Sequence, residues 1–274
     1  MQQKVILLLI DGLHYHKGRA MMGFLEHLVE SKKAWCRKIK TELPTLSRPA
    51  YEVVLTGTPA FDNGITSNYI VRRSREKSVF QIAKEKDLVT AAAAYYWFSE
   101  LYNRAPFDHL QDREYEDDNG FIRWGKFYFE DDYPDSHLIL DGEVLRRKYD
   151  PHFLLIHPMG LDYVGHRYGC ESKEYAEKII QMDSILSRFL PLWMELDYQV
   201  LITGDHGMNA FGQHGGTGED ERIVPLWGIG SVLENRQFPQ EISQLCIAPL
   251  LCQLLNIPKS KKMVDISSSG MTFC

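Results

Sequence analysis

Residues 5–12 of the chain read VILLLIDG, a continuous apolar run that ends in an acidic residue. Residues 153–157 (FLLIH) and 200–206 (VLITGDH) repeat this arrangement of a branched apolar run followed by polar side chains. Short, continuous apolar runs are typical of strands that are buried on both faces of a parallel sheet. The sequence therefore predicts strands at Val5–Ile10, Phe153–Ile156 and Val200–Thr203.

Segments with a helical spacing of apolar residues lie between and around these strands. They cover Ala20–Lys33, Pro49–Thr56, Ser78–Lys86, Ser172–Leu196 and Pro239–Leu255. Alternation of strands and helices predicts a doubly wound α/β fold, in which helices cover both faces of a mostly parallel central sheet. In such sheets, ligands bind in the crevice beyond the carboxyl ends of the strands.

The stretch from Tyr95 to His137 differs from the rest of the chain. It is dense in aromatic and acidic residues and has no clear period. We therefore expect a single α/β domain that spans residues 1–274 and carries a small, aromatic-rich cap insertion at about 95–137. Two interpretations of this insertion stay open: a self-packed excursion, or a part of the surface that recognises the substrate.

Composition narrows the class of protein. A net charge of −6 over 274 residues does not favour binding to a nucleic acid duplex. The N-terminal apolar run is too short for a signal peptide, and no stretch approaches the roughly 20 residues that cross a bilayer, so no membrane partner is expected.

Five cysteines without CxxC spacing are expected to be reduced thiols of a cytoplasmic protein. The oligomeric state stays open.

Six potential metal ligands follow the predicted strands or lie close behind them: Asp11, Asp162, His166, Asp205, His206 and His214. Asp162 and His166 are four residues apart, so on a helix they share one face. Three carboxylates and three imidazoles suffice to bind two neighbouring divalent cations. His157, at the end of a predicted strand, is either a residue that orients a ligand or a buried structural histidine.

Residues 44–57 read PTLSRPAYEVVLTG and contain a second candidate for chemistry. Proline suits the first turn of a helix, so a helix is expected to begin at Pro49. Ser47 would then lie near a helix N-terminus, where backbone N–H groups favour an anion. Its hydroxyl is either an ordinary helix cap or, beside two metals, a nucleophile.

The order of these motifs resembles that of the alkaline phosphatase superfamily, and most closely its type I phosphodiesterase/nucleotide pyrophosphatase branch. The motifs are DG at 11–12, PTLSRP at 44–49, TG at 56–57, DYVGHRYG at 162–169, DHGM at 205–208 and HG at 214–215. The resemblance implies an alkaline phosphatase-like fold and a two-metal phosphoesterase that hydrolyses phosphate diesters. Its substrate would be a small-molecule phosphate ester, with a nucleotide as one candidate.

The resemblance also implies roles for individual residues. One divalent ion would be bound by Asp162, His166 and His214, and the other by Asp11, Asp205, His206 and Ser47. Zinc is the expected metal, and manganese suits the same ligands. Ser47, rather than Thr45, would be the nucleophile and would form a phosphoseryl intermediate. Asn68, in the GITSN sequence at 64–68, would bind a phosphoryl oxygen.

Beside the expected nucleophile, the sequence differs from the pattern that is usual in this branch of the superfamily. Ser47 and Arg48 stand where the branch usually has a threonine and an aromatic residue that helps to hold a nucleobase. Arg48 is expected either to bind substrate, at a second phosphate or a carboxylate, or to pair with acidic residues of the 95–137 stretch. These departures keep a phosphomonoesterase or phosphonate hydrolase as the alternative. A non-catalytic metal-binding protein is a remote one, since every ligand position is intact.

Overall fold

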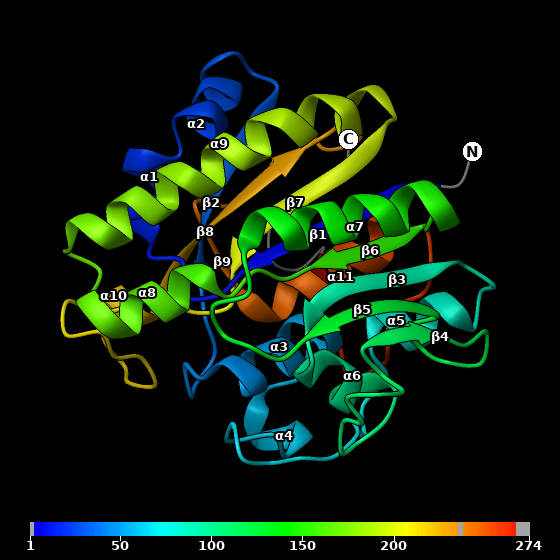
Figure 1. The fold of residues 1–274 in the computed structure, drawn as a ribbon. Helices are drawn as coiled ribbons and strands as arrows, with labels where there is room; N and C mark the ends of the chain where they lie inside the picture. Colours follow the sequence, from blue (N-terminus) through cyan, green and yellow to red (C-terminus); the bar gives the residue numbers. More distant parts are fainter. Residues whose placement is uncertain (1–2, 235–237, 267–274) are drawn as a thin grey trace.

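A computed structural model describes residues 3–234 and 238–266 of the chain. Its centre is a nine-stranded sheet with the order β4-β5-β3-β6-β1-β7-β8-β2-β9 (Figure 1). The strands are β1 (Lys4–Ile10), β2 (Ala34–Lys40), β3 (Thr90–Tyr95), β4 (Glu114–Glu116), β5 (Trp124–Tyr128), β6 (Phe153–Ile156), β7 (Tyr198–Gly204), β8 (Ile223–Ile229) and β9 (Glu241–Ser243). Strands β5, β3, β6, β1 and β7 run parallel to one another. The prediction of a mostly parallel α/β sheet is therefore confirmed.

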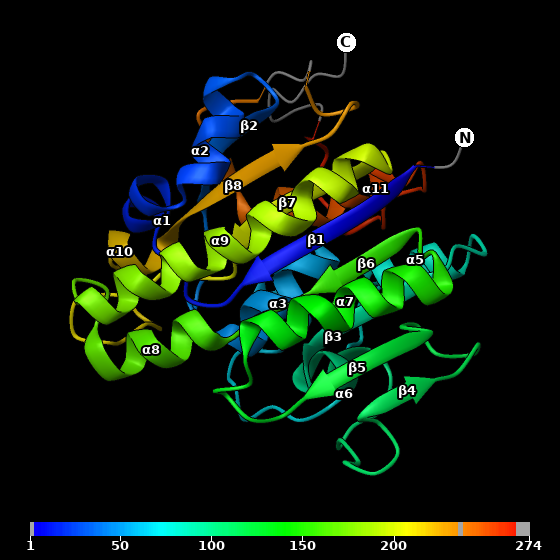
Figure 2. The same ribbon diagram turned by 45° about the horizontal axis from the view of Figure 1, so that its top comes forward.

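Helices cover both faces of this sheet, as Figures 1 and 2 show from two directions. One face carries α1 (Tyr15–Met21), α2 (Gly23–Glu30), α7 (Asp135–Tyr149), α8 (Gly160–Tyr168) and α9 (Lys173–Glu195). The other carries α3 (Ser47–Thr56), α5 (Val79–Lys84), α6 (Trp97–Tyr102) and α11 (Ile247–Leu254). The shorter helical turns are α4 (Ala60–Asn63), α10 (Glu219–Arg222) and η1 (Gln244–Cys246).

The first strand, β1, explains why the apolar run is continuous. Successive side chains of a strand point to opposite faces. Val5, Leu7 and Leu9 belong to the core on the α3 side, and the alternate residues Ile6, Leu8 and Ile10 belong to the core on the α9 side. All six side chains are fully buried, and each such burial stabilises the fold by roughly 1.5–3 kcal/mol.

The strand register brings the ends of β1 and β7 to the same level. Ile10 is the partner of Gly204 across the parallel β1–β7 pair. The next residues along the two strands, Asp11 and Asp205, therefore leave neighbouring strands side by side. On the other flank of β1, Leu8 is the partner of Ile156, the last residue of β6. The carboxyl ends of three strands thus converge on one place.

The stretch 95–137 is the main correction to the expected fold. Instead of a separate cap, it contributes α6 and the strands β4 and β5, and β5 pairs in parallel with β3. The sheet therefore continues through this stretch to its edge. The strand Trp124–Tyr128 is short and only partly alternating in burial, and acidic clusters flank it, so its periodicity was not visible in the sequence.

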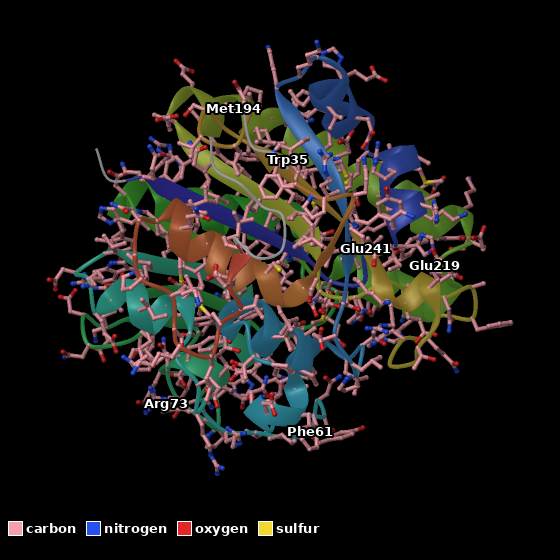
Figure 3. All side chains as sticks on the ribbon, turned by 180° about the vertical axis from the view of Figure 1, so that it is seen from behind. Trp35, Phe61, Arg73, Met194, Glu219 and Glu241 are labelled. Carbon is pink, nitrogen blue, oxygen red and sulfur yellow. The ribbon has the colours of Figure 1, made fainter. Side chains whose placement is uncertain are left out.

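Two of the expected helices are shorter than predicted. The segment 20–33 breaks at Met22, whose φ of −83° and ψ of 70° are not helical. The segment 239–255 begins as β9, because Glu241 pairs with Lys38 of β2, and only its second half forms α11. Pairing with a sheet edge overrides a helical pattern there. Figure 3, a view from behind, shows Glu241 beside β2, farther along that strand than Trp35.

The described cysteines Cys36, Cys170, Cys246 and Cys252 form no disulfide, and Cys274 lies outside the described residues. Within residues 3–234 and 238–266, no helix has both the length and the apolar composition that a membrane crossing requires.

Candidate active site

Three buried carboxylates meet at the carboxyl ends of the strands. Asp11 follows β1, Asp205 follows β7, and α8 supplies Asp162. The backbone N–H of Gly12 donates to the Oδ1 atom of Asp205 at 3.1 Å. Gly12 has a φ of 70°, and a Cβ at this position would come within 3.0 Å of the Cα atom of Asp162. Glycine is therefore required here, because the β1 end and α8 approach each other so closely.

Three histidines present the same ring nitrogen to this cluster. Each places its Nδ1 atom against a backbone carbonyl, and a carbonyl can only accept, so Nδ1 carries a proton and Nε2 is the nitrogen turned toward the site. The pairs are His166 with Gly212 O at 2.8 Å, His206 with Gly207 O at 2.9 Å, and His214 with Thr45 O at 2.7 Å. Histidine ligands of metals are commonly oriented in this way.

Five of the six residues form two overlapping groups, and His166 is in neither. We call Asp11, Asp205 and His206 the inner group, and Asp162, His206 and His214 the outer group. Within each group the potential ligand atoms lie within 4.8 Å of one another. His206 belongs to both groups, whereas the family resemblance places it at one metal only.

His166 lies at the outer edge of the outer group. Its Nε2 atom is 3.3 Å from Asp162 Oδ2 and 3.1 Å from His214 Nε2. Its side chain is 47% exposed, the most open of the six. Asp162 and His166 both lie on α8, so the expectation of a shared helix face is confirmed.

The residues present fit two divalent cations. One carboxylate oxygen of each aspartate is buried without a hydrogen-bond partner in the part of the chain that the structure describes: Asp11 Oδ1, Asp162 Oδ1 and Asp205 Oδ2. Orphaned carboxylate oxygens that face free imidazole lone pairs are electrostatically unfavourable unless a cation lies between them. The donor set of carboxylates and imidazoles is the one that zinc prefers, and manganese accepts it too.

The pKa values of the carboxyl groups reflect this crowding. Burial, followed by the charges of Asp11 and Asp162, raises the pKa of Asp205 well above its usual value. Burial and the charge of Asp11 also raise the pKa of Asp162. For Asp11, the effect of burial is outweighed by the adjacent imidazoles of His157 and His206, so its pKa is lowered. A site that holds three buried carboxyl groups needs positive charge to keep them ionised.

The pKa values of the three imidazoles also depend on how deeply each ring is buried. Burial and the neighbouring His206 lower the pKa of His214 to about 4, and burial lowers the pKa of His206. The hydrogen bond to Asp162 raises the pKa of the more open His166 to about 9. The two buried rings are therefore neutral near pH 7, which is the form that binds a metal.

Ser47 points into the site from the first turn of α3. The helix begins at Ser47, two residues earlier than expected, and its capping residue is Leu46, which makes no side-chain cap among the described residues. The interpretation of Ser47 as a helix cap is therefore wrong. Its Oγ atom lies 3.1 Å from His206 Nε2, and the residue is 4% exposed.

Thr45, the other hydroxyl of the motif, is occupied elsewhere. Its Oγ1 atom donates to the carbonyl of Gly216 at 2.9 Å and accepts the N–H of Gly215 at 2.8 Å. Its own carbonyl accepts the Nδ1–H of His214. Thr45 therefore fixes the loop that carries His214, and its hydroxyl does not face the site as the Ser47 hydroxyl does.

Asn68 lies beside the start of α3. Its side-chain oxygen accepts the backbone N–H of Arg48 at 3.0 Å, which satisfies one of the free N–H groups of the first turn. This bond orients the side-chain amide, and its Nδ2 donor is left for another acceptor. The sequence-predicted pair Ser47 and Asn68 is thus brought together at one helix end.

Arg48 adopts the second of its two expected arrangements. Its Nη2 atom lies 2.6 Å from Glu100 Oε2, and both side chains are buried. The guanidinium also stacks on the Trp97 ring, 4.5 Å from its centroid. Arg48 therefore pairs with an acidic residue of the 95–137 stretch, while its buried Nε and Nη1 atoms have no hydrogen-bond partner among the described residues, so a contact with substrate stays a prediction. The partner is Glu100 rather than a residue of either acidic cluster of that stretch, Glu114–Asp118 or Glu130–Asp135.

Sequence reasoning missed one residue of the site and left another undecided. Tyr51 donates its hydroxyl to Asp11, and the Nε2 atom of His157 lies 3.3 Å from the same carboxylate. The sequence contained one indication that Tyr51 belongs to the site. Tyr51 is four residues after Ser47, so on a helix the two side chains share a face.

Comparison with known proteins places the fold among phosphoesterases. The family model of the type I phosphodiesterase / nucleotide pyrophosphatase family matches residues 5–236. The structure of a murine ectonucleotide pyrophosphatase / phosphodiesterase is similar, with a TM-score of 0.76 and 11% identity, covering 98% of this chain and 100% of that one. This likeness shows the fold, which is that of the alkaline phosphatase superfamily.

Curated relatives are similar in sequence as well. The chain is 25% identical to the human GPI ethanolamine phosphate transferase 2 catalytic subunit over 95% of this chain and 27% of the relative. It is 32% identical to a GPI ethanolamine phosphate transferase 2 of Candida albicans over 46% of this chain and 16% of the relative. The alignments thus span only about a sixth to a quarter of these relatives.

Proposed function

Because the chain belongs to the type I phosphodiesterase/nucleotide pyrophosphatase family, we propose that it cleaves phosphate diesters as a two-metal enzyme, through a phosphoseryl intermediate on Ser47. The observation that carries this proposal is the position of the Ser47 hydroxyl. It lies 3.1 Å from the free Nε2 atom of His206, the residue shared by the inner and outer groups.

One divalent cation would be bound by Asp11, Asp205, His206 and Ser47, and the other by Asp162, His166 and His214. Zinc suits these ligands best, and manganese is compatible with them. When bound, such cations supply the positive charge that offsets a phosphate and lowers the pKa of a hydroxyl. The three buried carboxylates alone would repel a phosphate anion, so the same site without cations would not bind its substrate.

The residues of the chain perform the rest of the reaction. Ser47 Oγ attacks the phosphorus in line and forms an O–P bond as its hydroxyl proton is lost to solvent, while the bond from phosphorus to the leaving oxygen breaks and that oxygen takes a proton from solvent. The backbone N–H of Ser47 and the side-chain amide of Asn68 would bind the non-bridging oxygens, since the Arg48 N–H is donated to Asn68 and Pro49 has no N–H. Attack by water then breaks the Ser47–phosphate bond and regenerates the hydroxyl.

A diester is favoured over a monoester or a phosphonate by the position of Arg48. The monoester alternative depended on an arginine that would bind the additional negative charge of the substrate. The charge of the Arg48 guanidinium is offset by Glu100 and its face is covered by Trp97, although its Nε and Nη1 atoms have no hydrogen-bond partner in the described part of the chain. A phosphate diester carries one negative charge less than a monoester, so its binding does not require the charge of Arg48.

A second candidate reaction is transfer of the phosphoryl group to an alcohol instead of to water. Relatives named GPI ethanolamine phosphate transferase 2 align with 95% and 96% of this chain, which supports this candidate. Both reactions share the first step on Ser47, and they differ only in the acceptor of the second step.

The test is a paired assay of zinc-loaded protein on bis-p-nitrophenyl phosphate and p-nitrophenyl phosphate. We expect faster cleavage of the diester. A higher kcat/KM for the monoester would contradict the diester proposal and support the phosphatase alternative. Repeating the diester assay with added ethanolamine or glycerol separates hydrolysis from transfer, because only a transferase forms the mixed phosphodiester product.

A further inference from the structure

The two oxygens of Asp11 have different surroundings. Oδ2 accepts the hydroxyl proton of Tyr51 and lies 3.3 Å from His157 Nε2. Oδ1 lies 3.3 Å from His206 Nε2 and has no hydrogen-bond partner within the described residues. All four side chains are fully buried, so solvent does not compete for either oxygen. One oxygen is held by the protein, and the other is left for a ligand.

Tyr51 and His157 are themselves fixed by packing. The Tyr51 ring is stacked on Phe98, with a centroid distance of 4.3 Å and an angle of 21° between the ring planes. His157 meets the Tyr51 ring edge-on at 4.6 Å and the Phe98 ring at 4.9 Å. Rings packed on this many sides cannot rotate freely, so the Tyr51 hydroxyl has one available direction.

Tyr51 also links Asp11 to the nucleophile. Ser47 and Tyr51 are one turn apart on α3, so a single rigid helix directs one hydroxyl to His206 and the other to Asp11. Movement of α3 away from the end of β1 would break both contacts together.

We propose that Tyr51, together with His157, is a positioning residue: it holds Asp11 so that Oδ1 faces the cation of the inner group, and it ties the nucleophile helix to that cation. This inference rests on the proposed function, since it requires a cation at the inner group. It assigns a role to Tyr51 beyond core packing. Loss of the partners that orient a metal ligand typically weakens metal binding by about 10–100-fold.

The test is a zinc titration against a competing chelator, performed on the wild type and on Tyr51→Phe. The substitution keeps the stacked ring and removes only the hydroxyl. Tyr198→Phe is the matched control, because Tyr198 is also fully buried and donates its hydroxyl to Asp150 Oδ1 at 3.2 Å, at the end of β7 opposite to Asp205. We expect Tyr51→Phe to weaken one of two zinc equivalents by about 10–100-fold, and Tyr198→Phe to weaken neither.

A second variant identifies the weakened equivalent. Asp162→Asn removes a carboxylate of the outer group, so the zinc that remains is the inner one. Adding Tyr51→Phe to this background should weaken that remaining zinc by the same factor. His157→Gln should weaken the same equivalent, and it supports the test if Tyr51→Phe folds poorly. Far-UV circular dichroism of the metal-free variants separates a folding defect from a binding defect.

The outcomes separate this inference from the proposed function. If the wild type binds no divalent cation, both are overturned. If the wild type binds two and both Tyr51→Phe and His157→Gln bind them equally well, only the positioning role is overturned. Equal weakening by Tyr51→Phe and Tyr198→Phe also overturns it, since the effect would then be a general loosening of the core.

Discussion

The Nε2 atoms of His166 and His214 face each other at a distance of 3.1 Å, and each ring has its Nδ1 atom on a backbone carbonyl. Two lone pairs at this distance repel each other, so the pair needs either a proton, which His166 keeps near pH 7 because its pKa is raised to about 9, or a cation in place of that proton. We therefore expect chelation to lower the melting temperature by several degrees and zinc to restore it. A cation present at 100 times its dissociation constant stabilises the fold by about 2.7 kcal/mol. An unchanged melting temperature with saturating zinc would contradict a cation site here.

Ser47→Ala should abolish cleavage, because no other described hydroxyl is placed as the Ser47 hydroxyl is, against His206. We expect kcat to fall by about 1000-fold or more, with bound metal close to two equivalents. Ser31→Ala, a hydroxyl at the end of α2 that donates to Leu28 O, is the control and should leave kcat unchanged. Substantial turnover by Ser47→Ala would exclude Ser47 as the nucleophile.

Asp162→Asn should remove one metal equivalent, since Asp162 contributes the only carboxylate of the outer group. The measurement is elemental analysis of dialysed protein. Asp62→Asn, an exposed carboxylate on α4, should leave the metal content as in the wild type. Two tightly bound equivalents in Asp162→Asn would refute the ligand assignment.

Arg48→Met should destabilise the protein by about 3–5 kcal/mol, because it leaves the buried Glu100 carboxylate without its cation. Adding Glu100→Gln should recover much of this loss, since no buried charge then remains unpaired. Urea denaturation of the three proteins measures the difference. A small stability change with a large rise in KM would instead indicate that Arg48 binds the substrate.

The raised pKa of Glu52 predicts that the free energy of unfolding depends on pH. Burial, only partly offset by hydrogen bonds from Ser74 and Tyr102, raises the pKa of Glu52 from 4.5 to about 7. Between these values the folded state binds more protons than the unfolded state, so the free energy of unfolding falls as pH rises from about 4.5 to 7. This contribution is at most about 3 kcal/mol.

Glu52→Gln has no carboxyl group to titrate and should lack this slope. Thermal unfolding from pH 4.5 to 8 should therefore show the variant gaining stability relative to the wild type as pH rises. Parallel curves for the two proteins would show that Glu52 titrates near its ordinary value.

The sequence specified much of the fold because β1, β6 and β7 are buried on both faces. That burial requires continuous apolar runs, which are visible without a structure. The edge strands β4, β5 and β9 were not visible. They are short, and their place in the sheet depends on partners distant in the chain, such as β3 for β5 and β2 for β9.

The potential metal ligands, their order, and the strand ends that gather Asp11 and Asp205 were predictable without a structure. These are properties of residue type and local spacing. The folded chain was needed to show that Arg48 pairs with Glu100, that His206 belongs to both groups, and that Tyr51 donates its hydroxyl to Asp11. These contacts join side chains from elements that are far apart in the chain. The local spacing of residues does not indicate which distant partner a buried polar group will bind.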